Sequence, residues 1–531
     1  MAEPHLVTTR TMTGRWFGRW LGRWLRRWLG VAPGTVLVVT ATLIPLLVLV
    51  VETVDDPFSI WSRPGVVDAV WFSVWQGVLS AVITVVVGLV PTWILARHRV
   101  RGQRVLLAAF TVPFVLPTVV VGAAFLALLP DRLDRSLVAI LAAHVFFNVS
   151  VVIRTILPVW RSIDDDLLAA ARTLGAGPLT VARRVVWPLV RPAVFSAGAL
   201  VFVMCATSYG VIRVLGGTTW STIDVEVHRR AVVLGDLSGA AVLAATQAVV
   251  VVTALTLWTR RSNEWSRIES RRERRPRRPL LDVVVWSMAL AFAIPVIALV
   301  ATSLRSADGW SFEGWRNLFG LVDSRLPTIP LTDAVIHSLL YASLAAAIAV
   351  PSGVALARVA LRSTRRWTTS LVDLPIGVSA VAVGLGIVVT YDVDPIDVRG
   401  SWWLVPVVHA SVALPFVVRA AVPLLRSIPP RLGEAAATLG ATPWQRWRLV
   451  ELPLLRPALA TAAAFSAAMS LGEFGATSFL TRRDTTTLPV VIESLLSRPG
   501  SLSVMTGSAA AVLLLVLTAT LVVFVDRRAD L

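Results

Sequence analysis

Long apolar runs constrain this chain more than any other feature. The hydrocarbon core of a bilayer is about 30 Å thick, so a helix that crosses it needs roughly 20 residues with few charges. Only 15% of the residues are charged, against about 25% in soluble proteins. The sequence therefore predicts an all-α polytopic membrane protein with about twelve transmembrane helices. The runs lie near residues 34–51, 67–95, 105–129, 137–158, 192–213, 238–258, 281–304, 334–357, 370–390, 402–424, 456–478 and 505–525.

The side-chain inventory excludes several kinds of chemistry. All basic residues except histidine are Arg, and a phosphate-binding P-loop needs a Lys. The single cysteine, Cys205, rules out an internal disulfide and a Cys-rich metal site. No nucleophile–base pair or metal-ligand cluster occurs at a useful spacing. We therefore expect neither an enzyme nor a metal protein, and no cofactor bound by this chain.

The arginines alternate between the two sides of the predicted spans. Arg-rich segments precede the first span and follow the second, sixth, eighth and twelfth, all on one side of the membrane in a twelve-span arrangement. The connections on the opposite side are acidic or mixed. By the positive-inside rule, both termini and the Arg-rich loops are predicted to be cytoplasmic, in a multi-pass protein of the cell membrane. This interpretation also explains the net charge of +18 without a nucleic-acid partner.

The N-terminal segment, residues 1–33, contains the stretch GRWFGRWLGRWLRRWL. Its four-residue period places Arg, Trp and apolar side chains on adjacent stripes of a helix. Trp at headgroup depth and Arg reaching into water are typical of an amphipathic helix at the surface of a lipid bilayer. We predict such an anchor here.

The chain also contains an internal repeat. Residues 144–210 align with 409–475 at a constant separation of 265 residues and without a gap. The separation covers six spans, an even number, so the halves are parallel repeats related by an axis along the membrane normal. We predict a first half at 34–258, an Arg-rich linker at 259–280 and a second half at 281–531, with the transport pathway between the halves.

A polar loop interrupts the apolar pattern once in each half, at 159–191 and 425–455. In the second copy, the pattern predicts a helix that Gly440 ends and a short helix that begins near Pro443. Trp444, Trp447 and Val450 share one face of the short helix, and Leu179, Ala182 and Val185 match them in the first half. An exposed apolar helix of this kind indicates docking into a groove of a partner protein.

The second loop resembles the cytoplasmic EAA loop of binding-protein-dependent ABC importer permeases. That family's pattern is E-A-A, three residues, G, nine residues, an aliphatic residue, one residue and L-P. The residues that fit are Glu434, Ala435, Ala436, Gly440, Val450, Leu452 and Pro453. The first loop keeps part of the pattern, at Ala170, Ala171, Gly175, Val185 and Pro188, but has Ala169 where the family has Glu. Fused two-half permeases of this length look like those of ferric-iron and thiamine importers, which AHVFFN (143–148) and SLGEFG (470–475) also resemble.

The resemblance implies partners and a mechanism. An extracytoplasmic binding protein delivers substrate, and two ATP-binding cassette subunits, which hold ATP and Mg²⁺, dock on the loops and drive the pathway open and closed. Glu434 would contact an Arg of one ATPase, whereas Ala169 cannot, so we expect unequal docking sites. The resemblance favours ferric iron or thiamine as substrate and leaves sulfate, molybdate or a polyamine as alternatives.

Polar residues within the spans are candidates for the pathway, because ionisable groups are costly in lipid. His144, Asn148 and His409 could line it or could hydrogen-bond between packed helices. Tyr209 and Glu473, near the external end of the fifth span of each half, could form a gate or meet the binding protein. No carboxylate or cysteine accompanies the histidines at ligand spacing, so no metal site is predicted. An ion-coupled secondary transporter is the alternative function, although the spans contain few carboxylates.

Overall fold

The structure is a computed structural model. It describes residues 33–53, 59–262, 278–306, 309–321, 331–362, 378–393, 396–397, 401–482 and 484–529. Almost all of the predicted surface anchor at 1–33 and most of the predicted linker at 259–280 lie outside the described residues.

The described residues fold almost entirely into helices, joined by a few tight turns and two short hairpins. The first part contains α2 (Pro33–Val38), the π-helical turn η1 (Val39–Leu43), α3 (Ile44–Thr53), the 3₁₀ turn η2 (Ser59–Ser62), α4 (Val66–Arg97), α5 (Gln103–Val115), α6 (Thr118–Leu128), α7 (Leu137–Arg161), α8 (Asp165–Thr173), α9 (Pro178–Val181), the π-helical turn η3 (Ala182–Val186), α10 (Trp187–Ala206), α11 (Gly210–Leu215), α12 (Ile223–His228), the π-helical turn η4 (Arg229–Leu234) and α13 (Leu237–Ser262).

The second part contains α14 (Pro279–Ala291), α15 (Ile294–Thr302), β1 (Arg305–Ser306), β2 (Gly309–Trp310), α16 (Glu313–Leu318), α17 (Leu331–Arg362), α19 (Ala380–Tyr391), β3 (Asp392–Val393), β4 (Ile396–Asp397), α20 (Leu404–Ser427), α21 (Pro430–Thr438), α22 (Pro443–Arg446), the π-helical turn η5 (Trp447–Glu451), α23 (Leu452–Gly472), α24 (Thr477–Leu480), α25 (Leu488–Leu496) and α26 (Ser501–Ala529). Strands β1 and β2 pair antiparallel, with Arg305 opposite Trp310, and β3 and β4 pair antiparallel, with Asp392 opposite Asp397.

The described residues contain nine helices that are long and apolar enough to cross a membrane, or ten if the bent pair α5–α6 counts as one span. The prediction of an all-α polytopic protein is confirmed, with fewer full-length spans than the twelve expected. The described parts of the first and ninth predicted runs contain shorter apolar helices, Pro33–Leu49 and Ala380–Tyr391. The fifth and eleventh spans begin earlier than predicted, at Pro178 and Pro443, because the short loop helices run without a break into the long helices behind them.

The third predicted span is bent by 102° between α5 and α6. The bend occurs at Leu116 and Pro117, which both have extended backbone angles. The ring of a proline disfavours the helical conformation of the residue before it, so the helix ends at this point and restarts.

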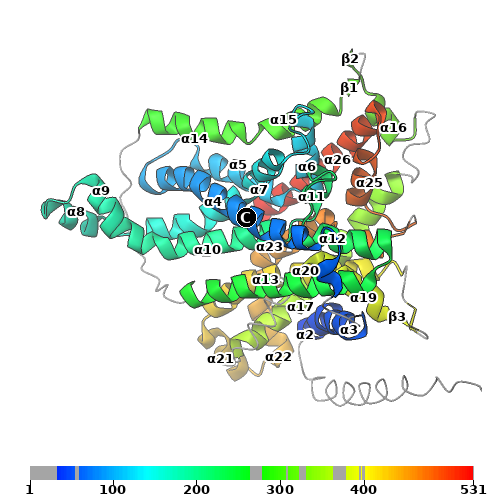
Figure 1. Ribbon diagram of the computed structural model, residues 1–531. Helices are drawn as coiled ribbons and strands as arrows, with labels where there is room; N and C mark the ends of the chain where they lie inside the picture. Colours follow the sequence, from blue (N-terminus) through cyan, green and yellow to red (C-terminus); the bar gives the residue numbers. More distant parts are fainter. Residues whose placement is uncertain are drawn as a thin grey trace, which may run out of the picture.

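The internal repeat recurs in the helix boundaries. Helix α4 matches α17 from end to end at the separation of 265 residues, and α8–α9–η3 matches α21–α22–η5 in the same way. In Figure 1, α8 and α9 project from the left edge and α21 and α22 lie at the lower left, away from β1, β2 and α16 at the upper right. We call the end of the bundle that carries α8–α9 and α21–α22 the loop end, and the opposite end the far end.

The leading helices of the two halves exchange places. Helices α2 and α3 pack against α17 and α19 of the second half, and α15 packs against α6 of the first half. Figure 1 shows the blue α2–α3 beneath the yellow-green helices, and the green α14–α15 above the blue and cyan ones. Each half therefore holds the other across a shared apolar core, which contains buried residues of α6, α7, α12, α19, α25 and α26.

Candidate functional site

The two loops at the loop end have the same backbone. Helices α8 and α21 each end at a glycine with a left-handed backbone, Gly175 (φ +83°) and Gly440 (φ +79°). The amides after these glycines turn back to the helix: Ala176 N donates to Ala171 O at 3.1 Å, and Ala441 N donates to Ala436 O at 3.0 Å. This pattern is a Schellman ending, and glycine is favoured there because a side chain is strained at positive φ.

A short helix follows each glycine and begins with a proline, at Pro178 and Pro443. In the second loop, Thr442 Oγ1 accepts from Gln445 N and Gln445 Oε1 accepts from Thr442 N, which is a complete capping box. The helix predicted to end at Gly440 and the one predicted to begin near Pro443 are therefore both present. Pro188 and Pro453, the last positions of the family pattern, are exposed at the start of α10 and α23.

Two equivalent apolar positions are strongly exposed in both loops, and Leu449 in η5 is 69% exposed in the second loop alone. Leu174 and Leu439 are each 88% exposed, Leu179 is 81% exposed and Trp444 is 66% exposed. The three-residue face expected from the sequence is only partly presented, since Trp447 and Val450 are half-buried, as is Val185 in the first loop. The wider π-helical turns η3 and η5 begin at Ala182 and Trp447, so the regular helical spacing on which that expectation rested does not continue past Arg446.

The acidic position of the pattern differs between the loops as the sequence indicated. Glu434 is exposed on α21, and the equivalent Ala169 is exposed on α8. Of the acidic residues at the start of α8, Asp164 caps the helix by accepting from Asp166 N at 3.0 Å, and Asp165 lies 3.5 Å from Arg97 Nη1. Of the small residues beside these positions, Ala170 and Ala435 are exposed, and Ala171 and Ala436 are half-buried.

The two loops are fixed to the bundle by different chemistry. In the second loop, Glu451 forms an ion pair with Arg358 of α17 and lies 3.3 Å from Arg446 Nε. The Arg358 guanidinium also lies over the Trp447 ring, 3.9 Å from its centre. The first loop is fixed mainly by buried apolar side chains, in one cluster with α10, in addition to the contact between Asp165 and Arg97 of α4. They are Ile163, Leu168, Val181 and Val186.

A cavity of about 300 Å³ lies between the two halves. Most of its lining comes in equivalent pairs, such as Thr207 with Gly472 and Met204 with Met469, so the cavity lies on the axis that relates the halves. Of the predicted pathway residues, His144, Asn148, Tyr209 and Glu473 line it.

Aromatic rings make up much of the cavity wall, a feature that the sequence reasoning missed. Phe114 packs on Phe147 with ring centres 5.4 Å apart, and Phe416 packs on Phe465 at 5.2 Å. At equivalent positions of the two halves, Tyr209 lies against Phe474 at 5.0 Å. Tyr209 and Phe474 follow the far-end termini of α10 and α23, so they close the cavity across the axis on that side.

In the second half, His409 lies behind the cavity wall in a closed polar network. Its Nδ1 lies 2.7 Å from Ser470 Oγ, and its Nε2 lies 2.8 Å from Thr477 Oγ1 and 3.3 Å from Glu473 Oε2. Glu473 also accepts from Ala476 N at 2.9 Å and Thr477 N at 3.0 Å, where it stabilises the start of α24. Both residues therefore hold the second half together, and Glu473 reaches the cavity only as part of that network.

In the first half, the equivalent network is open. His144 Nδ1 lies 3.0 Å from Ser80 Oγ, and Asn148 Nδ2 donates to His144 O at 3.0 Å and to Cys205 Sγ at 3.4 Å. His144 Nε2 and Asn148 Oδ1 are buried without a hydrogen-bond partner. The two histidines matched in sequence thus differ in surroundings, and only His144 lines the cavity.

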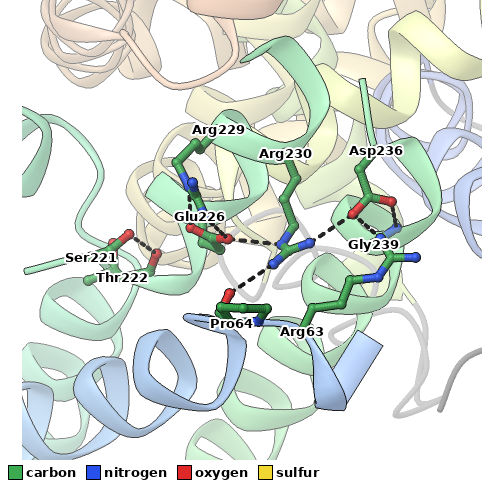
Figure 2. Close-up of polar contacts among 9 residues, drawn as sticks. All are labelled: Arg63, Pro64, Ser221, Thr222, Glu226, Arg229, Arg230, Asp236 and Gly239. Carbon is green, nitrogen blue, oxygen red and sulfur yellow. Dashed lines mark hydrogen bonds and ion pairs between the residues drawn. The ribbon is translucent and has the colours of Figure 1, made fainter. Parts of the chain in front are cut away.

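A charged cluster fixes the far end of the first half (Figure 2). Arg230, which is buried, lies 2.9 Å from Glu226 and 2.8 Å from Asp236, and it donates to Pro64 O at 3.3 Å. Arg63 pairs with Asp236 from the other side. The positions that match Glu226 and Arg230 in the second half are Val491 and Leu495, so the repeat gave no signal for this cluster.

Comparison with known proteins identifies the family. The description "Binding-protein-dependent transport system inner membrane component" matches residues 92–264 and 349–530, which together exceed half of the chain and contain one loop each. The thiamine transport system permease protein ThiP of Brucella abortus (strain 2308) is 28% identical over 86% of this chain and 87% of its own length. ThiP of Escherichia coli (strain K12) is 26% identical over 89% and 91%. The putative 2-aminoethylphosphonate transport system permease protein PhnV of Salmonella typhimurium (strain LT2) is 35% identical over 37% of this chain and 74% of its own length.

These matches replace the alternative of an ion-coupled secondary transporter. The family consists of membrane components without catalytic activity, and ATP is handled by separate ATPase subunits of the same transport systems. The chain belongs to the inner membrane components of binding-protein-dependent transport systems, and it is a multi-pass ABC importer permease with two fused halves.

Proposed function

We propose that this permease imports thiamine, or a closely similar organic molecule with a planar ring. The observation that carries this proposal is the cavity between the halves, whose wall holds three pairs of packed aromatic side chains. Aromatic rings attract other flat rings and cations through their faces. Relatives similar to this chain over most of its length are named thiamine permeases.

The same wall is poorly suited to ferric iron, the other substrate that the sequence favoured. Hard cations select carboxylate and other oxygen ligands. The one carboxylate of the lining, Glu473, is already engaged by two backbone amides, Thr477 and His409. Within the described parts of the chain, no group of three His, Cys, Asp or Glu side chains could hold a metal ion.

The two loops are proposed to dock two ATPase subunits at the cytoplasmic face, which makes the loop end cytoplasmic and places both termini there. Leu174 and Leu179 in the first loop, and Leu439 and Trp444 in the second, supply the apolar contact, and Glu434 supplies the charged one. Large apolar side chains that are exposed together on a protein surface mark a site that a partner covers. The proposed docking residues also include the small and turn-forming positions of the loops and their half-buried apolar positions. They are Ala170, Ala171, Gly175, Val185, Pro188, Ala435, Ala436, Gly440, Trp447, Val450 and Pro453.

The far end is proposed to receive the extracytoplasmic binding protein, with Tyr209 and Phe474 as the gate beneath it. The two rings come from equivalent positions of the two halves, so a tilt of the halves away from their common axis at the far end separates them. Tyr209 Oη lies 3.5 Å from Ser478 Oγ of the second half, which is a weak contact that such a tilt breaks at low cost.

The test is transport by the assembled system. The permease, its ATPase and its binding protein are reconstituted in proteoliposomes, and ATP-dependent uptake of labelled thiamine, ferric iron and 2-aminoethylphosphonate is compared. We expect thiamine uptake that requires ATP and the binding protein. Uptake of ferric iron or the phosphonate in its place would contradict the proposed substrate.

A further inference from the structure

We propose that His144 and Asn148 form a substrate-reading pair in the cavity, which binds the edge of an amino-substituted nitrogen heterocycle during passage. This inference rests on the proposed function and makes it more specific. Passage through an importer does not by itself need a site within the membrane. A built site here means that the permease selects its substrate a second time, after the binding protein.

The geometry of the pair defines the edge that it can read. The residues lie one turn apart on α7, on the same side of the helix, and both line the cavity. Asn148 Nδ2 is occupied by His144 O and Cys205 Sγ, so the amide has its oxygen left as a free acceptor. Ser80 Oγ lies 3.0 Å from His144 Nδ1 and 3.4 Å from Gln76 Oε1, and we take its one hydroxyl proton to be donated to the nearer acceptor, His144 Nδ1. The ring proton then lies on Nε2, which becomes a free donor.

A donor beside an acceptor matches a ring nitrogen next to an amino group. The ring nitrogen accepts from His144 Nε2, and the amino group donates to Asn148 Oδ1. Such edges occur in aminopyrimidines and related heterocycles, a class that includes the pyrimidine ring of thiamine. Both polar atoms are buried and unsatisfied without a ligand, and buried polar groups without partners are unfavourable, so a ligand that satisfies them gains affinity.

The rest of the cavity supports this class of ligand over one chosen by charge. The rings of Phe114 and Phe147 line the same cavity, where a flat heterocycle can stack. The two charged residues in the lining, Glu473 and Arg419, have opposite signs. Net charge therefore does not select the ligand.

The matching positions of the second half do not form such a pair. Asn148 is matched by Ala413, and His409 has both ring nitrogens engaged. One reading pair thus faces one side of a cavity whose lining comes mostly from equivalent positions. A ligand in the cavity is bound in a single orientation, with its polar edge towards α7.

The first measurement uses the wild-type complex of permease and ATPase in nanodiscs, without the binding protein. Binding of thiamine is compared with binding of an analogue whose ring amino group is replaced by hydrogen. We expect thiamine to bind and the analogue to bind about tenfold more weakly, the loss typical of one missing hydrogen bond in a buried site.

The second measurement tests whether the preference for thiamine over the analogue depends on Asn148. Asn148→Ala removes the acceptor, so thiamine and the analogue should bind this variant with similar, weakened affinity. Ser411→Ala is the matched control, because Ser411 is buried on the equivalent helix α20 and its hydroxyl donates only within that helix, to Val408 O at 2.8 Å. The control should keep the tenfold preference, and size-exclusion chromatography confirms that each variant assembles with the ATPase.

Two results would overturn the reading pair. One is a wild-type complex that transports thiamine with the binding protein but shows no binding without it. The other is a tenfold preference for thiamine that Asn148→Ala leaves intact. In both cases uptake of thiamine persists and the proposed function stands, whereas loss of the proposed function appears as no thiamine uptake at all.

Discussion

The two halves of this permease share their helix boundaries but are fastened by opposite chemistry at the two ends. At the loop end, Glu451 of the second half is ion-paired, and its equivalent in the first half is the buried Val186. At the far end the roles are exchanged, because Glu226 of the first half is ion-paired and its equivalent is the buried Val491. At these two matched positions, each half therefore has one charged and one apolar contact.

The exchange of an ion pair for an apolar cluster indicates that the repeat conserves the backbone geometry more strictly than the side-chain contacts that fix the helices to one another. Glycine and proline recur where the backbone needs them, as at Gly175 and Gly440, whereas an ion pair and an apolar cluster serve equally well behind them. The two kinds of attachment differ in their response to mutation. Removal of one partner of a buried ion pair leaves an unpaired buried charge, which is costly, whereas a mutation in an apolar cluster leaves no unpaired charge.

The largest effect is expected at the far end of the first half. Glu226→Val leaves the buried Arg230 with one carboxylate instead of two, and we expect the free energy of unfolding to fall by about 3 kcal/mol. Adding Arg230→Leu reproduces the pair Val491 and Leu495 of the second half and should restore most of the loss. Detergent unfolding curves of the purified permease measure both. If the double variant were no more stable than the single one, the exchange of chemistries would not be neutral to the fold.

The next effect concerns the exposed apolar contacts of the two loops. Trp444→Ala should weaken the affinity of the permease for its ATPase about 30-fold, because tryptophan dominates protein interfaces, and Leu179→Ala about fivefold. Binding of the purified ATPase to nanodisc-embedded permease measures both. Equal losses at the two positions would show that the second loop does not bind more strongly than the first.

The acidic position gives a smaller effect on transport. Glu434→Ala removes a charge-assisted contact to the ATPase and should lower ATP-driven uptake about tenfold. Ala169→Glu places the missing carboxylate on the exposed face of α8, and we expect it to be tolerated with little change in uptake. Unchanged uptake and complex recovery in Glu434→Ala would contradict the docking role of this residue.

The sequence predicted the helical class, the repeat, the loops and the family, because these depend on apolar length, on glycine and proline, and on a spacing that recurs after 265 residues. The described residues contain nine or ten helices that could cross a membrane, against the twelve predicted, and the fifth and eleventh begin earlier than predicted. A π-helical turn that joins a short helix to a long one has no signature in hydropathy. The aromatic wall of the cavity was also missed. Phe114 and Phe465 match Ser379 and Leu200, so apart from Tyr209 and Phe474 the rings of one half do not recur in the other, and only the fold brings them together.

A further prediction tests the part that the halves share. At Gly440, with φ at +79°, Ala should cost about 1 kcal/mol because a side chain is strained there. Gly177→Ala is the control, since Gly177 has an ordinary φ of −67°, has nothing within 4 Å of an added side chain and is matched by Thr442. ATPase-stimulation assays and thermal melts compare the two. A control as damaging as Gly440→Ala would mean that the loop surface, and not the backbone turn, sets the requirement.

The smallest effect is a pH dependence confined to the charged attachment of the first half. Burial of Asp236 opposes its ionisation, but hydrogen bonds from Arg63, Gly239 N and Arg230 outweigh it and hold the pKa of this carboxyl below its ordinary value. A lowered pKa in the folded state adds stability above the ordinary pKa of about 3.9, and this stability is lost as the pH falls through the lower folded value.

Wild-type permease should therefore melt at a higher temperature than Asp236→Asn above pH 5, and the difference should shrink as the pH approaches 3. The second half has Ser501 at the matched position, so Ser501→Ala should show a difference from wild type that does not change with pH. A difference between wild type and Asp236→Asn that stays constant from pH 6 to pH 3 would mean that the Asp236 carboxylate is not what fixes the corner between η4 and α13. The charged and apolar attachments would then be equivalent in their response to acid as well as in their geometry.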